Sequence, residues 1–378
     1  MDHLDTIRSQ FPVTENRVFL NHAAISPIPL ASVKAVEALL EQIARYGGES
    51  YPEWMEKIEE VRILAAELLS CRPGELAFTG NTSEGLSMVA AGLKWRKGDV
   101  VLIPDPEFPA NLYPWENLAF QGVRTRRIQR KNGSFHVEDA EKALVPGTRL
   151  VSVSSVDFSA GFRCDLEALG DFCRRKGILF CVDAIQSLGI IPMNVKKYGI
   201  HFLSAGGHKW LLSPMGCGIV YISEEANHFV HPDRVGWKSV MDEENFSQKD
   251  FRLKPDALRF EPGSMNVAGI YALGAAIRLL NEAGLERVHQ RIMFLNDLFI
   301  QGLQDRKIDI ASSLTANERS GILSFFLDGN PVALHGFLND RNIIVSVRNG
   351  MVRLSPHCYN NPDDVALFFE GLDQFLSK

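Results

Sequence analysis

The chain has 378 residues, of which 46% are hydrophobic and 23% are charged, and its formal net charge is −6 with an isoelectric point near 6.0. A chain of this length can bury a large core and suits one large domain with a smaller one. Its acidic balance argues against nucleic acid and anionic membranes as partners, which favours small-molecule chemistry.

Two further features restrict location and metal chemistry. The chain does not open with a cationic stretch followed by an apolar one, and no apolar run approaches the length of a membrane span. We therefore expect a cytoplasmic protein. The six cysteines show no Cys-x-x-Cys spacing, so they indicate neither a disulfide framework nor a metal site.

The first 70 residues predict an approach segment and two helices. Residues 1–30 suggest a short helix and then an extended loop, whose two prolines exclude a helix there. Asn21 and His22 lie in this loop, where they either line the entrance of a substrate site or cap turns. Apolar residues recur at helical spacing over residues 30–46 and 54–69.

Strand and helix patterns then alternate up to residue 222. Short apolar runs between helices are typical of a mostly parallel sheet covered on both faces, so we predict an α/β fold. The predicted strands cover residues 75–79, 100–103, 123–128, 150–156, 178–183, 202–204 and 218–222, and the predicted helices residues 82–93, 111–120, 137–144 and 166–176.

The C-terminal third predicts a loop-rich passage and a smaller α/β unit. Residues 229–258 are charged and irregular, and a long helical pattern follows that Gly284 interrupts. We expect a large domain over 16–260 and a smaller domain from 1–15 and 261–378. The predicted elements here are a helix over 266–303, strands near 322–327 and 351–354, and helices near 332–339 and 362–376.

Residues just beyond the predicted strands are candidates for ligand binding, because ligands of open α/β sheets bind at the carboxyl ends of the strands. Asn81, Thr82 and Ser83 open a helix, where backbone N–H groups and hydroxyls could hold a phosphate. Ordinary helix capping would explain the same residues. Phe108 follows the next strand and could stack on a flat heteroaromatic ring, although an aromatic residue there is more often core.

Asp183 and Lys209 are the most informative of these candidates. Asp183 ends a very apolar strand, and a buried carboxylate needs a cationic partner such as the pyridinium nitrogen of pyridoxal 5'-phosphate (PLP); capping of the next helix is the alternative. Gln186, one turn later, could donate to the phenolic oxygen of the same ring. Burial would lower the pKa of Lys209 and leave a neutral amine that forms a Schiff base with an aldehyde such as PLP.

Three other residues complete the candidate site. His208 stands beside Lys209 and could reach a phosphate, and Ser264 offers a hydroxyl before a helix. Arg353 lies on a short apolar strand and could bind a substrate carboxylate, with a structural salt bridge as the alternative. Lys209 follows Asp183 by 26 residues, and the whole combination is hard to obtain by chance, so we hypothesise that Lys209 carries PLP.

With these residues assembled, the chain resembles the class V aminotransferase family of fold-type I PLP enzymes. That family includes cysteine desulfurases, selenocysteine lyases, kynureninases and isopenicillin N epimerase-like proteins. The resemblance runs from Asn21 to the C-terminus, and its specific elements are Asp183-Ala-Ile-Gln186 and Gly206-Gly-His-Lys209. It implies the fold of this family, a homodimer with shared active sites, and an amino-acid substrate.

The resemblance also implies a role for each candidate residue. Lys209 would form the Schiff base and move protons, and Asp183 would pair with the ring nitrogen. Ser264 would reach the phosphate bound by the partner subunit. The remaining expected contacts are the ring oxygen for Gln186, the phosphate for Thr82 and His208, the ring face for Phe108 and the substrate carboxylate for Arg353.

Departures from the family pattern bear on the reaction. The desulfurase branch often has His where Phe108 stands, Ser where Gly206 stands, and a nucleophilic Cys on a loop before the carboxylate-binding arginine. Here residues 343–352 contain no cysteine, and Cys358 follows Arg353. A persulfide-forming desulfurase is therefore disfavoured, whereas a selenocysteine or cystine lyase that needs no such thiol stays open.

We therefore expect a PLP-dependent enzyme acting on an amino acid, an aminotransferase first. Residues 107–115 are similar to the functionally mixed epimerase-like branch. An epimerase or a cysteine or selenocysteine C–S lyase is the alternative, and in each case Lys209 would remove the Cα proton. A catalytically inactive PLP-fold binding protein is the alternative from another class.

Overall fold

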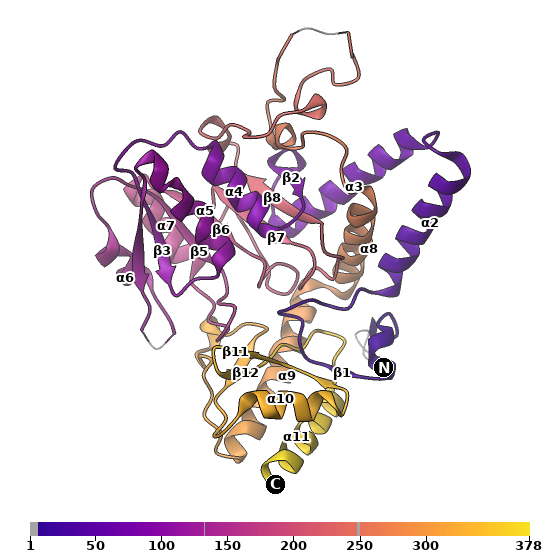
Figure 1. The fold of residues 1–378 in the computed structure, drawn as a ribbon, viewed down its shortest axis with the longest axis vertical. Helices are drawn as coiled ribbons and strands as arrows, with labels where there is room; N and C mark the ends of the chain where they lie inside the picture. The colour runs from indigo at the N-terminus through magenta and orange to yellow at the C-terminus, as the bar shows by residue number, and fades with distance from the viewer. Residues whose placement is uncertain (1–6, 132, 248–249) are drawn as a thin grey trace.

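A seven-stranded sheet forms the centre of the larger part of the molecule (Figure 1), with strand order β2-β8-β7-β6-β5-β3-β4. The structure is a computed structural model that describes residues 7–131, 133–247 and 250–378. Neighbouring strands pair in parallel except β8, which is antiparallel to both β2 and β7. The strands are β2 (Leu76–Thr79), β3 (Val100–Asp105), β4 (Arg124–Gln129), β5 (Thr148–Ser154), β6 (Leu179–Asp183), β7 (Phe202–Gly206) and β8 (Gly218–Ile222).

Helices cover both faces of this sheet, because successive strand residues alternate between two buried clusters. Phe180 and Val182 belong to the cluster formed with α3, α7 and α8, whereas Cys181 belongs to the cluster formed with α4 and the segment that contains Trp115. The helices of this part are α2 (Leu30–Tyr46), α3 (Tyr51–Leu69), α4 (Thr82–Gly92), α5 (Tyr113–Glu116), α6 (Val137–Ala143), α7 (Leu166–Lys176) and α8 (Val267–Ala283).

The C-terminal residues, joined by strand β1 from the start of the chain, form a second layered unit with its own core, at the bottom of Figure 1. A three-stranded antiparallel sheet has the order β11-β12-β9, and β1 pairs with β10 in parallel. Helices α9, α10 and α11 accompany these sheets. The elements are β1 (Val18–Phe19), α9 (Leu285–Asp305), β9 (Leu323–Phe325), α10 (Pro331–Asn339), β10 (Ile343–Ile344), β11 (Ser346–Arg348), β12 (Met351–Leu354) and α11 (Pro362–Leu376).

The predicted α/β class and the mostly parallel sheet are confirmed. The domain division into 16–260 and 1–15 with 261–378 stays a proposal, and residues 1–6 lie outside the described residues. Helix α8 falls in the proposed smaller domain, yet it packs against α2 and α3. Within the described part of the chain, no helix is both long and apolar enough to cross a membrane.

One predicted element differs in form. A single helix is expected over 111–120, but the chain forms a 3-10 turn at Pro109–Asn111, the one-turn helix α5, and a second 3-10 turn at Asn117–Gln121. Pro114 lies inside the expected helix and lacks the backbone N–H that a continuous helix would need there, whereas Pro109 opens the 3-10 turn just before it. The short turns let Asn111 and Trp115 face the interior, where the Trp115 Nε1 donates to the Asn111 Oδ1 at 3.2 Å.

Candidate active site

Loops at the carboxyl ends of the parallel strands meet the C-terminal hairpin around one cavity of about 420 Å³. The carboxyl ends of β2, β3, β6 and β7 lie at the same edge of the sheet, because these four strands run in the same direction. The structure brings nine of the sequence-predicted residues to this cavity, namely Asn81, Thr82, Ser83, Phe108, Asp183, Gln186, His208, Lys209 and Arg353.

Lys209 lies in the turn after β7, with only 9% of its surface exposed. Its Nζ stands 5.6 Å from the centroid of the Phe108 ring and forms no ion pair within the described chain. Burial lowers the pKa of this amine to about 8, opposed by Asp183 and assisted by Arg353. About a tenth of the amine is therefore neutral at pH 7, far more than for an ordinary lysine, and the neutral amine is the form that attacks an aldehyde.

Asp183 ends β6 with 2% of its surface exposed. Its Oδ1 accepts the Ile185 N–H at 3.0 Å, and no cation lies within ion-pair distance among the described residues. Burial, assisted by the charge of Glu107, raises the pKa of this carboxyl to about 7, and the Ile185 N–H and Lys209 oppose the shift. A buried acid without a cationic partner fits the protonated ring nitrogen of PLP.

Two hydrogen bonds fix the orientation of the Gln186 side-chain amide at the cavity. Its Oε1 accepts the Trp210 indole N–H at 2.9 Å, and its Nε2 donates to the Ala23 carbonyl at 3.1 Å. The amide has a second N–H on Nε2. A donor on this side of the cavity suits the phenolic oxygen of a PLP ring.

The start of α4 and His208 form the end of the cavity that fits a phosphate. The Asn81 side chain accepts the Glu84 N–H at 3.0 Å, and the Thr82 Oγ1 accepts the Gly206 N–H at 2.9 Å, which ties the helix to β7. Free N–H groups in the first turn of a helix attract anions. A Cβ added at Gly206 would come within 3.1 Å of the His208 Nδ1, so the glycine leaves room for that ring.

Arg353 of β12 faces the cavity with a free donor. Its Nε donates to the Ser346 Oγ at 3.1 Å and its Nη1 to the Phe158 carbonyl at 2.5 Å, whereas the buried Nη2 has no partner in the described chain. Burial lowers the pKa of this guanidinium to about 9, which still leaves it charged at neutral pH. The side chain is 1% exposed and makes no salt bridge within the described residues. An unpaired buried guanidinium fits a carboxylate ligand.

Three predicted site residues lie elsewhere. His22 is fully buried behind the cavity, where Nδ1 contacts the Ser355 carbonyl at 2.8 Å and Nε2 the Tyr359 hydroxyl at 2.7 Å. Asn21 bridges to Ser355 through its backbone, and the residues that follow, 23–25, line the cavity instead. Ser264 lines a separate cavity of about 250 Å³.

Two residues that the sequence reasoning missed contribute to this site. Glu107 is buried and its charge raises the pKa of Asp183; it accepts the Ser154 hydroxyl and the Phe108 N–H, each at 2.7 Å, and so fixes the turn that carries Phe108. The sequence signal for Glu107 is its position directly before Phe108, the candidate ring-stacking residue. Arg348 lines the cavity beside Arg353. The signal for Arg348 was its place just before an Asn-Gly turn that leads back to Arg353.

The cysteines stay away from this cavity. None of the six lines it, and five are buried. The Cys358 Sγ lies 3.2 Å from the His357 Nδ1, and burial raises the pKa of its thiol to about 12. In the part of the chain that the structure describes, no cluster of His, Cys, Asp and Glu is suited to a metal ion.

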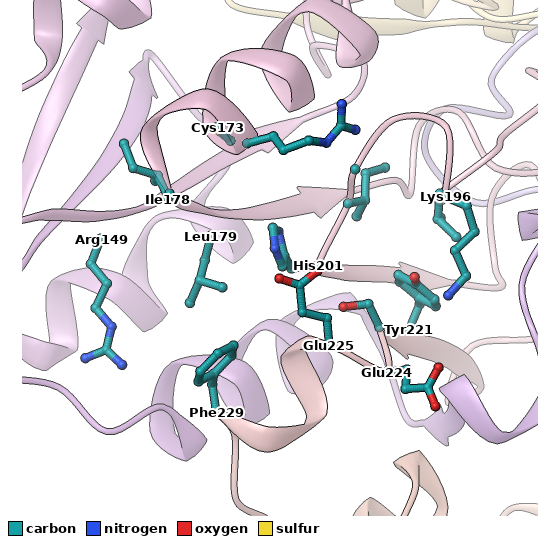
Figure 2. Close-up of a pocket in the computed structure, with 16 residues that line it drawn as sticks. Arg149, Cys173, Ile178, Leu179, Lys196, His201, Tyr221, Glu224, Glu225 and Phe229 are labelled. Carbon is teal, nitrogen blue, oxygen red and sulfur yellow. The ribbon is translucent and has the colours of Figure 1, made fainter.

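A larger cavity of about 590 Å³, shown in Figure 2, lies at the opposite edge of the sheet. Its lining includes Leu179 at the start of β6 and His201 just before β7. Its cations are already neutralised, because Arg149 pairs with Asp99, Arg174 with Asp171 and Lys196 with Glu75. The combination of a poised amine, an unpaired acid and an unpaired guanidinium is found at the cavity of Lys209, which we take as the candidate active site.

Comparisons with known proteins agree with this geometry. The family model described as "Aminotransferase class-V" matches residues 18–368. The chain belongs to the class-V aminotransferase family. Among its relatives, probable cysteine desulfurases of Pyrococcus abyssi and Methanothermobacter thermautotrophicus are 29% and 30% identical to it, over 99% and 98% of this chain and 98% and 97% of theirs. The apo structure of a cysteine desulfurase from Thermococcus onnurineus has a TM-score of 0.90 and 28% identity, and the match covers 98% of each chain.

This class-V aminotransferase family member is thus a PLP-dependent enzyme, as the sequence predicts. The residues around the cavity fit the cofactor, because an amine with a lowered pKa, an acid without a cation and a helix start lie around one space. The expectation of a catalytically inactive binding protein is not supported. The narrower expectation of an aminotransferase is not specifically supported by these relatives, whose names favour C–S lyase chemistry.

Proposed function

We propose that this enzyme breaks the Cβ–S bond of a cysteine-type amino acid, the lyase alternative among the predicted functions. Relatives named as probable cysteine desulfurases match it along nearly their whole length, which supports the proposal. The names of these relatives favour a lyase over an aminotransferase, and the grouping of Lys209, Asp183 and Arg353 around one cavity supports the PLP chemistry that both reactions share. The three side chains supply the base, the acid partner and the carboxylate site that such chemistry needs.

We further propose a role for each of these side chains. Arg353 binds the substrate carboxylate through its free Nη2 and so orients the Cα–H bond, and the Lys209 Nζ takes the Cα proton. Bound PLP supplies an electron sink for the charge left on Cα. Asp183 keeps the ring nitrogen protonated, and Gln186 donates to the ring oxygen.

The other cavity residues would bind the cofactor. The N–H groups and side chains at the start of α4 hold the phosphate together with His208. Phe108 covers one face of the ring, because its own ring already lies 5.6 Å from the Lys209 Nζ. The residues proposed for the phosphate are Asn81, Thr82, Ser83 and His208.

The sulfur product is proposed to leave without a protein thiol. No cysteine lines the cavity, and the segment before Arg353 is a tight hairpin whose turn is Asn349-Gly350. For L-cysteine, an elimination fits this site: the Cβ–S bond breaks with its electron pair on sulfur, which leaves as sulfide after protonation. The remaining three-carbon unit adds water and yields pyruvate and ammonia, so no external reductant is needed.

An aminotransferase is the second candidate. An uncharacterized aminotransferase of Bacillus subtilis is 27% identical over 100% of this chain, which supports it. The same Lys209 would then return the proton to the cofactor carbon that carried the aldehyde, which would leave the amino group on the cofactor and release a 2-oxo acid. The two reactions therefore differ in product and not in their first step.

Product analysis separates these functions. The holoenzyme is incubated with L-cysteine, L-cystine, L-selenocysteine or L-alanine, and sulfide, selenide, pyruvate, alanine and the cofactor spectrum are measured. We expect release of sulfur or selenium with a three-carbon product. Conversion of the cofactor to its pyridoxamine form with a 2-oxo acid, and without loss of sulfur, would contradict the lyase and establish transamination. Lys209→Ala serves as the control and should be inactive in both.

We also propose a homodimer with shared active sites. Ser264 lies on a separate cavity of its own chain, and Ile25 and Phe108 expose apolar surface at the Lys209 cavity. In the dimer, Ser264 would approach the phosphate of the partner subunit, and the partner would cover Ile25, whereas Phe108 would be covered by the cofactor ring.

A further inference from the structure

The indole ring of Trp210 lies directly behind the cavity and contacts one of the residues that line it. Trp210 follows Lys209 in the turn after β7 and is fully buried. Its Nε1–H donates to the Oε1 of Gln186 at 2.9 Å. Gln186 lines the Lys209 cavity and Trp210 does not, so the indole N–H acts on a bound cofactor through this amide.

The partners of the Gln186 amide decide which of its ends faces a ligand. The oxygen and nitrogen ends are nearly equal in shape but opposite in hydrogen-bonding character. An indole N–H is only a donor and therefore requires the Gln186 oxygen on its side. The carbonyl of Ala23 is only an acceptor, and it takes one N–H of the Gln186 Nε2 at 3.1 Å. The second N–H of Nε2 is thereby left for a ligand in the cavity.

The indole itself is held in place by residues from distant parts of the chain. It stacks on the imidazoles of His22 and His357, with ring centroids 6.2 and 5.9 Å away and interplanar angles of 27° and 29°. Its far edge lies so close to Gly321 that a Cβ added there would come within 2.7 Å of the indole Cη2. These contacts restrict rotation of the ring and keep its N–H directed at Gln186.

The two imidazoles that stack on Trp210 are neutral. Burial lowers the pKa of His22 well below its usual value and that of His357 to about 4, so neither ring is charged at neutral pH. The stack therefore orients the indole without placing a positive charge behind Gln186.

We propose that Trp210 is a positioning residue, whose indole N–H acts through Gln186 to direct an N–H donor, and not an amide oxygen, at the ring oxygen of the bound cofactor. This inference rests on the proposed placement of Gln186 beside that oxygen. When Lys209 carries PLP, its nitrogen shares its proton with the same oxygen. A second donor on the oxygen weakens this sharing and so lowers the pKa of the nitrogen.

Two substitutions of Trp210 separate its N–H from its packing. Trp210→Phe keeps a six-membered aromatic ring in the stack but removes the N–H. Trp210→His loses more of the buried ring, yet its Nε2 can take the place of the indole Nε1 and donate in the same way. Titration of the visible absorbance of each purified holoenzyme with pH gives the pKa of the Lys209 nitrogen that carries PLP.

The two variants should differ in this pKa. We expect Trp210→Phe to raise it by at least about 0.5 unit, the size of one weakened hydrogen bond to a charged oxygen, and Trp210→His to stay within about 0.2 unit of the wild type. A merely structural role predicts the opposite order, because His leaves the larger void. The charged groups that act on Lys209 are the same in every variant, namely Asp183, Arg348 and Arg353.

A double variant shows whether the indole acts through the amide. Gln186→Leu removes the amide at similar size and should raise the pKa at least as much as Trp210→Phe. In the Gln186→Leu background, Trp210→Phe should add no further shift. Trp54→Phe is the matched control, because Trp54 also donates its indole N–H to a glutamine oxygen, that of Gln42 at 2.7 Å, outside the cavity. This control should titrate as the wild type does.

The outcomes separate this proposal from the proposed function. An unchanged pKa in Trp210→Phe, or a larger shift or loss of PLP in Trp210→His, overturns the role of Trp210, whereas loss of PLP from Trp210→Phe alone supports it. Additive shifts in the double variant, or no shift in Gln186→Leu, overturn the path through Gln186. C–S lysis stands in all these cases, because release of sulfur is measured separately. The expected shifts without release of sulfur overturn C–S lysis alone.

Discussion

Lys209 and Asp183 have unusual acidities for the same physical reason. Both are buried, so each loses favourable hydration of its charged form, and their partial compensation of each other does not restore ordinary values. The amine therefore becomes more nucleophilic, and the carboxyl becomes ready to accept a cation. Both shifts suit the binding of an aldehyde cofactor with a basic ring nitrogen.

The lowered pKa of Lys209 predicts how the cofactor-free protein captures PLP as the pH changes. Only the neutral amine attacks the aldehyde, so a pKa of about 8 makes the capture rate rise about tenfold per pH unit below that value and level off above it. An unperturbed lysine would keep rising to about pH 10. Stopped-flow absorbance measures the rate, and a steep rise that continues from about pH 9 to about pH 10 would contradict the account.

Cys358 tests the proposal that no protein thiol takes part. Its buried thiol has a raised pKa and does not line the cavity. We expect Cys358→Ala to keep kcat/KM for its sulfur-containing substrate within about twofold of the wild type, with at most a small loss of stability from the removed sulfur atom. Lys209→Ala provides the inactive reference, and a complete loss of sulfur release in Cys358→Ala would show that we have misjudged this thiol.

At the scale of elements, α8 packs so closely on α3 that a single methyl group is predicted to disturb it. A Cβ at Gly274 would lie 2.3 Å from the Val61 Cγ2, and the β-branched Val61 has little freedom to move. Gly274→Ala should therefore cost about 1–3 kcal/mol in the free energy of unfolding, as overpacking of a core does. Urea unfolding of the holoenzyme measures it.

Gly336 of α10 is the matched control. A Cβ there meets nothing within 4 Å, so Gly336→Ala should stabilise the protein by up to about 1 kcal/mol through helix propensity alone. If Gly274→Ala and Gly336→Ala changed the free energy of unfolding equally, the close packing of α8 on α3 at Gly274 would be contradicted.

The long, periodic elements could be predicted from the sequence, whereas the shortest ones could not. Helix α7 and the break at Gly284 lie where the apolar spacing puts them. Strands β1 and β10 have two residues each, too few for an alternating pattern, and each exists only because the other lies beside it. Their pairing brings the ends of the chain together, which no local pattern reports.

The candidate site was predictable where a residue follows a recognisable strand, as Asp183 and Lys209 do. His22 shows the limit of such reasoning, because its side chain turns inward to Tyr359, a contact between residues 337 positions apart. Arg348 shows the converse. The Asn-Gly turn after it is visible in the sequence, but its place at the cavity beside Arg353 follows from the pairing of β11 with β12 in the assembled structure.

At the scale of the whole molecule, the proposed homodimer predicts a native mass of twice the chain mass of 42.2 kDa. Exposed apolar side chains near the cavity, including Ile25 at 52%, would be covered by the partner. Light scattering coupled to size-exclusion chromatography measures the mass. A monomer that retains full activity at micromolar concentration would exclude the sharing of active sites and the proposed role of Ser264.

The central claim is that Lys209 holds the cofactor, and it has a direct measurement. The purified holoenzyme is reduced with borohydride and digested, and the pyridoxyl-labelled peptide is identified by mass spectrometry. We predict that the label lies on Lys209 and that Lys209→Ala carries no covalently attached cofactor after the same treatment. A label on another lysine, or a reducible covalent cofactor in Lys209→Ala, would contradict the account.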